Sequence, residues 1–86
     1  MLDGKFLERY VGEYDLQLDA PIKVVLEDGV LLREYNGSRY ALHPINDTQF
    51  YIAESDLIYL FVIAEDGEVT GVDIDQSGTS IYASRL

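Results

Sequence analysis

Hydrophobic and polar positions alternate along most of the chain, in short segments that end at residues typical of turns. Alternation with a period of two is the pattern of a strand with one buried face. The turn signals are Asp19-Ala20-Pro21, Asp28-Gly29, Asn36-Gly37, Asn46-Asp47, Glu54-Ser55-Asp56, Asp66-Gly67 and Ser77-Gly78. They predict eight strands, over residues 11–18, 22–27, 30–35, 39–45, 48–53, 57–64, 68–75 and 79–85.

One segment departs from this alternation. Leu57–Ala64 is a run of eight apolar residues, closed by Glu65-Asp66-Gly67. A continuous apolar run rich in β-branched and aromatic residues is typical of a strand covered on both faces. The run is too short to span a membrane as a helix. We therefore expect it to be the strand around which the others are arranged.

The two Asp-Gly pairs predict how their flanking strands align, because Asp-Gly favours the positive φ angles of a tight hairpin turn. With the first pair as a two-residue loop, Leu26 lies opposite Leu31. With the second, a loop of two or four residues places Ala64 opposite Val69. The side chains of the first hairpin predicted to point to the core are Ile22, Val24, Leu26 and Leu31.

The second hairpin also predicts a mixed face on the central strand. Asp73 lies beside Leu60 and Asp75 beside Ile58, with Val62 further along the same side. Burying two unpaired carboxylates would cost several kcal/mol, so this face is expected to be partly wet. The apolar residues of this face are still expected to be partly buried, either by an N-terminal helix or by another chain.

Residues 3–9 are predicted to form a short N-terminal helix. Asp3 is a suitable N-cap, and Phe6 and Leu7 give the helix an apolar side. So short a helix is not stable alone. We expect Phe6 and Leu7 to dock on the face that carries Ile58.

Consecutive hairpins without crossover helices predict an all-β fold, an antiparallel up-and-down meander. Its seven to eight strands remove their exposed edges most easily by closing into a small lipocalin-like barrel or half-barrel. A barrel of this size is filled by side chains or holds one small ligand. Gly71, in the middle of a predicted strand, suits a bend or a close backbone approach.

Length and charge narrow the classes of function. The 86 residues form a single domain, 1–86, because neither half could bury a core of its own. Sixteen acidic against six basic residues give a net charge of −10, which argues against nucleic-acid binding. The absence of cysteine excludes disulfides and thiolate zinc sites, and no cofactor is expected.

No localisation signal is recognisable in this sequence. The segment Met1–Lys5 lacks the basic-then-apolar build of a signal peptide, and no transmembrane segment is apparent. Membrane insertion is therefore not expected. The compartment stays undetermined, and export of a longer parent protein stays open.

Seven tyrosines and no tryptophan suggest a second kind of site. Tyr14, Tyr40, Tyr51, Tyr59 and Tyr82 alternate with polar residues, so each ring can pack while its hydroxyl reaches water at a barrel mouth. Of these, Tyr14, Tyr40 and Tyr51 are the candidates for a binding site. Packing in the core and at the rim is the simpler interpretation. The alternative is a pocket for a small apolar ligand or a patch that faces a partner.

Metal and catalytic motifs are weak. Asp73, Asp75 and Ser77 match the first half of a calcium loop, but the twelfth position, which needs a bidentate acid, is Ser84. A solvated acidic hairpin turn is the simpler interpretation.

His43 is the single histidine, with an aspartate shortly after it. Such a pair could act as a general base, but a strand-end histidine bonded to backbone or water is more usual.

Several segments together resemble a known family. They are Leu7-Glu8-Arg9-Tyr10-Val11-Gly12-Glu13-Tyr14, the run from Ile22 to Leu31, Leu42-His43-Pro44 with Phe50, and Asp66-Gly67-Glu68-Val69 with Gly71. The family has a lipocalin-like barrel and unknown function, and is found at the carboxyl end of β-lactamase-like and penicillin-binding-protein-like serine hydrolases. The resemblance implies that the nucleophile and its Ser-x-x-Lys motif, which does not occur here, belong to a preceding hydrolase domain.

Two function hypotheses follow. The leading one is a non-catalytic accessory or interaction domain, whose Ile58, Leu60 and Val62 face meets a serine-hydrolase domain or a second copy of the chain. The alternative is a lipocalin-like module that binds a small apolar ligand within the barrel, lined by the tyrosines named above. An enzyme is not expected, because the residues show no set of polar groups that bond breaking would need.

Overall fold

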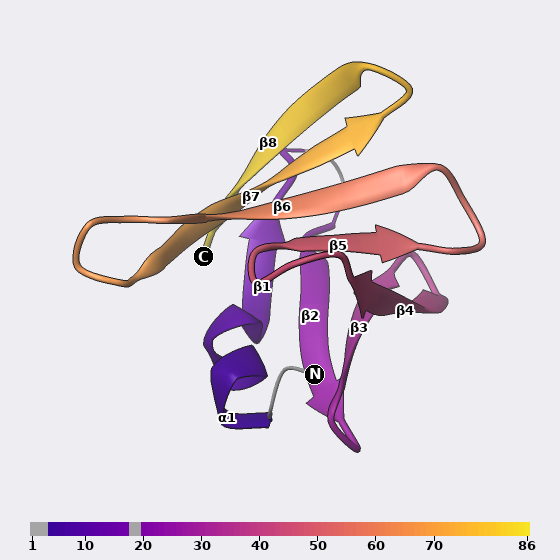
Figure 1. Cartoon of the computed structure of the whole chain (residues 1–86). Helices are drawn as coiled ribbons and strands as arrows, with labels where there is room; N and C mark the ends of the chain where they lie inside the picture. Colours follow the sequence, from indigo (N-terminus) through magenta and orange to yellow (C-terminus); the bar gives the residue numbers. More distant parts are fainter. Residues whose placement is uncertain (1–3, 18–19) are drawn as a thin grey trace.

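The structure, a computed structural model, describes residues 4–17 and 20–86 (Figure 1). Two helical turns open it, α1 (Gly4–Leu7) and the 3₁₀ turn η1 (Glu8–Tyr10). The strands follow as β1 (Gly12–Asp15), β2 (Ile22–Glu27), β3 (Val30–Tyr35), β4 (Ser38–Pro44), β5 (Gln49–Ile52), β6 (Leu57–Ile63), β7 (Val69–Gln76) and β8 (Thr79–Arg85).

The strands form a closed antiparallel barrel in which each pairs with the next along the chain. β8 returns to β1 through two residue pairs, Tyr14 with Arg85 and Asp15 with Ser84. The predicted all-β meander is therefore confirmed, and the barrel closes fully instead of stopping at a half-barrel. Because the contact with β1 is short, residues 79–83 of β8 pair only with β7 within the described chain.

The first hairpins have the tight turns that the sequence predicts. Asp28 and Gly29 have φ angles of 52° and 78°, and the turn at 36–37 has the same signs. Positive φ at both central residues defines a type I′ turn, whose twist matches the flanking strands. Leu26 consequently lies opposite Leu31, as the sequence predicts.

The hairpin between β6 and β7 differs from the prediction by one residue. A three-residue loop is closed by a hydrogen bond from the Ala64 N–H to the Glu68 carbonyl at 2.8 Å, with Gly67 at a φ of 88°. Ile63 therefore lies opposite Val69, and the predicted pairing of Ala64 with Val69 is wrong. A bulge just before Ile63 absorbs the shift. The rest of the β6–β7 register matches the prediction.

The predicted and observed strand bounds differ most at β1. The predicted strand over 11–18 ends at Asp15, because the Asp15 side chain accepts a hydrogen bond from the Gln17 N–H at 2.8 Å and starts a turn. The predicted N-cap Asp3, the last residue of that predicted strand and Asp19 of the following turn lie outside the described residues.

The barrel axis is filled by side chains. The buried apolar residues are Leu7, Tyr10, Tyr14, Ile22, Val24, Leu31, Leu42, Phe50, Ile52, Tyr59, Phe61, Val69, Val72 and Ala83. Of the predicted core positions in the first hairpin, Leu26 is only partly buried. Burial of several aromatic rings, each with a large apolar surface, dominates the free energy that stabilises so small a domain.

The helical segment closes one end of the barrel (Figure 1). The Tyr10 ring stacks on Phe61, with 4.3 Å between the centroids, and its hydroxyl donates to the Asp47 carbonyl at 2.7 Å. Arg9 donates to the Gly67 carbonyl at 3.1 Å. These contacts tie the segment to the β4–β5 and β6–β7 loops, which lie at the same end.

This position differs from the one that the sequence suggests for the helix. Leu7 and Tyr10 lie inside the barrel, on the opposite side of β6 from Ile58, Leu60 and Val62. The physical reason is that a tyrosine following the helix fills the end of the barrel and meets aromatic partners there. Docking on the partly wet outer face would bury less apolar surface.

Candidate functional site

The outer surface of β5, β6, β7 and β8 contains the mixed face that the sequence predicts. Strand pairing places Tyr51, Ile58, Asp75 and Ser80 in one row across the sheet, and Gln49, Leu60, Asp73 and Tyr82 in the next. These eight residues are called the β5–β8 face below.

Three large side chains of this face are open to solvent. Tyr51 is 42% exposed, Leu60 37% and Tyr82 47%. Ile58, between them, is partly buried. Large apolar groups that adjoin one another on a surface indicate an interaction site, whereas single scattered ones do not.

Carboxylates lie among these apolar groups. Asp73 is placed between Leu60 and Tyr82, and Asp75 adjoins Ile58 in the other row. In the part of the chain that the structure describes, the ion pairs are those of Arg39, so neither aspartate has a basic partner. The β5–β8 face is therefore apolar and negatively charged.

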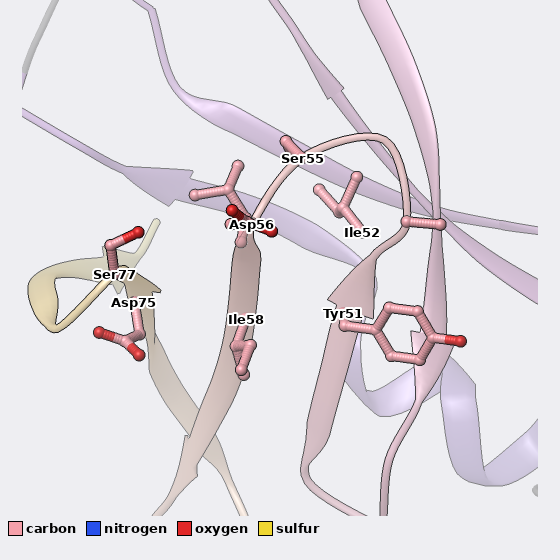
Figure 2. Close-up of a pocket in the computed structure, with 9 residues that line it drawn as sticks. Tyr51, Ile52, Ser55, Asp56, Ile58, Asp75 and Ser77 are labelled. Atoms are coloured by element: carbon pink, nitrogen blue, oxygen red, sulfur yellow. The ribbon is translucent and has the colours of Figure 1, made fainter.

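Two open depressions lie on this surface. One, of about 600 Å³, lies over the β5–β6 turn and the end of β7. Figure 2 shows Ile58 and Asp75 on neighbouring strands there, with Ser55 and Asp56 close to the turn. The other, of about 320 Å³, adjoins Leu60. Their shape is suited to protruding side chains of a partner more than to an enclosed ligand.

Val62, the third predicted residue of the β6 face, lies beside this patch. It is partly buried and pairs with Gly71. The Thr70 hydroxyl donates to the Val62 carbonyl at 3.3 Å, and the Tyr82 hydroxyl donates to the Thr70 carbonyl at 3.1 Å. Side chains of the same sheet thus cover this part of the strand.

The three predicted tyrosines have different environments. Tyr14 is fully buried, its hydroxyl donates to the Tyr10 carbonyl at 2.8 Å, and burial raises the pKa of Tyr14 to about 12. The Tyr51 ring lies on the outer surface against His43, 5.1 Å between ring centroids. Tyr40 lies beside an arginine inside the barrel. The structure does not bring the three together into one pocket.

That arginine, Arg33, is a residue that the sequence analysis does not single out. It pairs with Val24 and Tyr40 in the sheet, and only 9% of its surface is exposed. Its Cζ lies 5.1 Å from the Tyr40 ring centroid, and its Nε is buried without a hydrogen-bond partner among the described residues. The alternation along the strand could have identified Arg33 as an inward residue, because the register that turns Leu31 inward also turns Arg33 inward.

The weak calcium candidate does not form a loop. Asp73 and Asp75 belong to the extended strand β7, and Ser77 follows in the turn with a φ of 52°. Among residues 4–17 and 20–86, no group of three or more His, Cys, Asp or Glu is placed to hold a metal ion. His43 packs on Tyr51, so its position is explained by ring packing.

Within the described chain, no helix combines the length and apolar character needed to cross a membrane. Comparison with known proteins finds no matching family model, curated protein or solved structure. The geometry of these surfaces is therefore what bears on function.

Proposed function

We propose that this domain is a non-catalytic interaction module that docks on a partner through the β5–β8 face. The observation that carries the proposal is the exposure of Tyr51, Leu60 and Tyr82 on neighbouring strands around Asp73. Tyrosine is enriched among the residues that dominate binding energy at interfaces, because it buries a large surface and keeps a polar hydroxyl. The closed barrel supplies a rigid platform for this face.

The charge of the face favours one class of partner. If the face met a second copy of itself, Asp73 and Asp75 would approach the same carboxylates across a two-fold axis. Each copy also carries a net charge of −10, and opposed like charges at an interface cost several kcal/mol. We therefore favour a different protein surface, with Lys or Arg beside apolar side chains.

A β-lactamase-like serine hydrolase domain is the partner that the family resemblance implies. In such an arrangement the bond-breaking residues lie in the hydrolase, and this barrel supports or orients it. This is consistent with a face whose large exposed side chains are aromatic or apolar and whose charged groups are acidic.

Calorimetric titration of this domain with a β-lactamase-like serine hydrolase domain tests this function. Leu60→Lys and Asp73→Lys are expected to weaken binding by about tenfold or more. Glu65→Lys, in the β6–β7 loop away from the face, is the matched charge control and should bind as the wild type does. Circular dichroism of each variant confirms that the barrel is intact.

The outcomes separate the parts of the proposal. Unchanged binding in both face variants would exclude the β5–β8 face, and absence of binding by the wild type would exclude the hydrolase as partner. Sedimentation across a range of concentrations is expected to show a monomer. A dimer that is lost in Leu60→Lys would instead make a second copy the partner.

The alternative of an apolar ligand on the barrel axis has less support. Tyr10, Phe50 and Phe61 contact one another there, with centroid distances of 4.3 to 5.6 Å. A ligand would have to displace these rings. Native mass spectrometry of the purified protein is expected to show the mass of the chain alone.

A further inference from the structure

The two ends of the barrel are built differently. Tyr10 and the helical segment close one end. The β3–β4, β5–β6 and β7–β8 turns lie at the other, because alternate turns of a meander share an end (Figure 1). There residues 79–83 of β8 pair only with β7 within the described chain, and Ile81 is 52% exposed although it alternates inward with Ala83. This end, called the open end below, therefore has an accessible apolar wall.

Arg33 points into the barrel near the open end. Its guanidinium lies over the Tyr40 ring and close to Tyr59. Burial raises the pKa of Tyr59, whereas the charge of Arg33 and its hydrogen bond to the Tyr59 side chain act in the opposite direction. Tyr35, next along the inward side of β3, is partly buried. Aromatic groups thus lie around the cation.

Arg33 differs from the other arginines in its hydrogen-bond acceptors. Arg39 pairs with two glutamates, and Arg9 and Arg85 each donate to backbone carbonyls. In the described chain Arg33 alone has neither a carboxylate nor a carbonyl acceptor, and its Nε is buried. A buried charge without an anionic partner is unfavourable. Among the acidic residues that the structure describes, none is placed to neutralise it.

A second unpaired polar atom lies at the same end. Ser55 Oγ, in the β5–β6 turn, and Arg33 Nε are the buried side-chain atoms without a partner in the described residues. Ile74 pairs with Ile81 on the inward side of the β7–β8 hairpin and with Tyr59, the ring beside Arg33. Tyr59 thus connects the cation with an inward apolar surface. An arrangement of one cation beside an apolar wall is suited to an amphipathic anion.

We propose that the open end binds a small organic carboxylate, with its head group paired to Arg33 and a short apolar tail along Ile74 and Ile81. The planar guanidinium can donate from Nε and one Nη to both oxygens of a carboxylate, which is its preferred bidentate geometry. The ligand supplies the acceptor that Nε lacks. This site is separate from the β5–β8 face, so it does not depend on the proposed docking function.

The net charge of −10 does not prevent such binding. Repulsion from surface carboxylates is screened beyond about 8 Å at physiological salt, whereas contact with the buried guanidinium is not. The affinity is therefore expected to hold or rise when salt is added. Binding of an anion by exposed lysines would instead weaken.

Titration with hexanoate, followed by NMR of the arginine Nε–Hε signals, tests the proposal in the unaltered protein. The Arg33 signal is expected to shift, and hexanol and hexylamine serve as ligand controls. Arg33→Gln is expected to weaken hexanoate binding by about tenfold or more, since a charge-assisted hydrogen bond is lost. Arg39→Gln is the matched control, because Arg39 is exposed and already paired.

Each outcome either supports or contradicts the carboxylate site. A shift of the Arg33 signal, loss of binding in Arg33→Gln and retention in Arg39→Gln support the site. Absence of any shift at millimolar hexanoate, equal binding of hexanol, or unchanged binding in Arg33→Gln overturns it. If Arg33→Gln does not fold, the Nε–Hε shift and the hexanol control in the wild type still give the answer.

Discussion

The phenol of Tyr82 on β8 lies across the backbone of Gly71 on β7. A Cβ built on Gly71 would overlap that phenol and lie 2.7 Å from the Ala83 carbonyl oxygen. The Tyr82 hydroxyl meanwhile donates to the Thr70 carbonyl at 3.1 Å. A glycine is therefore what lets an exposed aromatic ring lie flat on the β5–β8 face.

Gly71→Ala is expected to lower the free energy of unfolding by about 1–3 kcal/mol, because the added methyl group forces the strands or the ring to move. Chemical denaturation measures this. Adding Tyr82→Ala should recover only part of the loss, since the Ala83 carbonyl remains in the way. Ser80→Ala, at an exposed neighbouring position, is the control. A Gly71→Ala variant as stable as the wild type would show that the close approach is not maintained.

Local signals made much of the barrel predictable. Asp28-Gly29 both specifies a type I′ turn and lies between alternating segments, so β2 and β3 follow with their register. The long apolar β6 and its pairing with β7 were predictable for the same reason, apart from the loop. There the sequence does not distinguish a two- or four-residue loop from the three-residue loop that the structure has.

Contacts between distant segments were not predictable in this way. The apolar side of the N-terminal helix is consistent with docking on either side of β6, and only the fit of Tyr10 against Phe61 decides between them. The isolation of Arg33 depends on where every carboxylate lies in space. Strand alternation gives the direction of the side chain but cannot show that its Nε has no acceptor among residues 4–17 and 20–86.

Substitution of Tyr10 tests how the barrel end is closed. Tyr10→Phe keeps the stack on Phe61 and loses the hydrogen bond to the Asp47 carbonyl, so it should cost about 1 kcal/mol of unfolding free energy. Tyr10→Ala also leaves a cavity and should cost about 3–5 kcal/mol. Urea denaturation compares them, with the exposed Tyr51→Phe as control. Equal losses in the two Tyr10 variants would contradict the packing of this ring.

Arg33 and Arg85 form a matched pair for stability. Arg33→Met should leave the free energy of unfolding unchanged or raise it by about 1 kcal/mol, because the apolar chain replaces a buried charge that has no carboxylate partner among the described residues. Arg85→Met should lower it by about 1–3 kcal/mol, since the Val11 carbonyl, 2.7 Å from Arg85, loses its donor. Thermal and urea denaturation without ligand measure both. A loss in Arg33→Met as large as in Arg85→Met would give Arg33 a structural role.

The buried phenol of Tyr14 predicts a pH dependence at the alkaline end. Its folded pKa is about 12, against the ordinary tyrosine pKa of 10.0 when unfolded, so the folded state holds the proton more tightly. The contribution of Tyr14 to stability is fully present below pH 10 and is lost as the pH rises from about 10 to about 12. One pKa unit corresponds to about 1.4 kcal/mol, so a shift of two units makes the loss about 3 kcal/mol. Urea titrations at successive pH values measure it.

Tyr14→Phe separates this contribution from the rest. At neutral pH the variant should be less stable by about 1 kcal/mol, because the hydrogen bond to the Tyr10 carbonyl is lost. Above pH 10 its stability should fall less steeply than that of the wild type, so that the two curves converge. The remaining slope belongs to Tyr10 and Tyr59, whose pKa values burial also raises. Parallel curves for the wild type and Tyr14→Phe would mean that burial does not hold the Tyr14 proton.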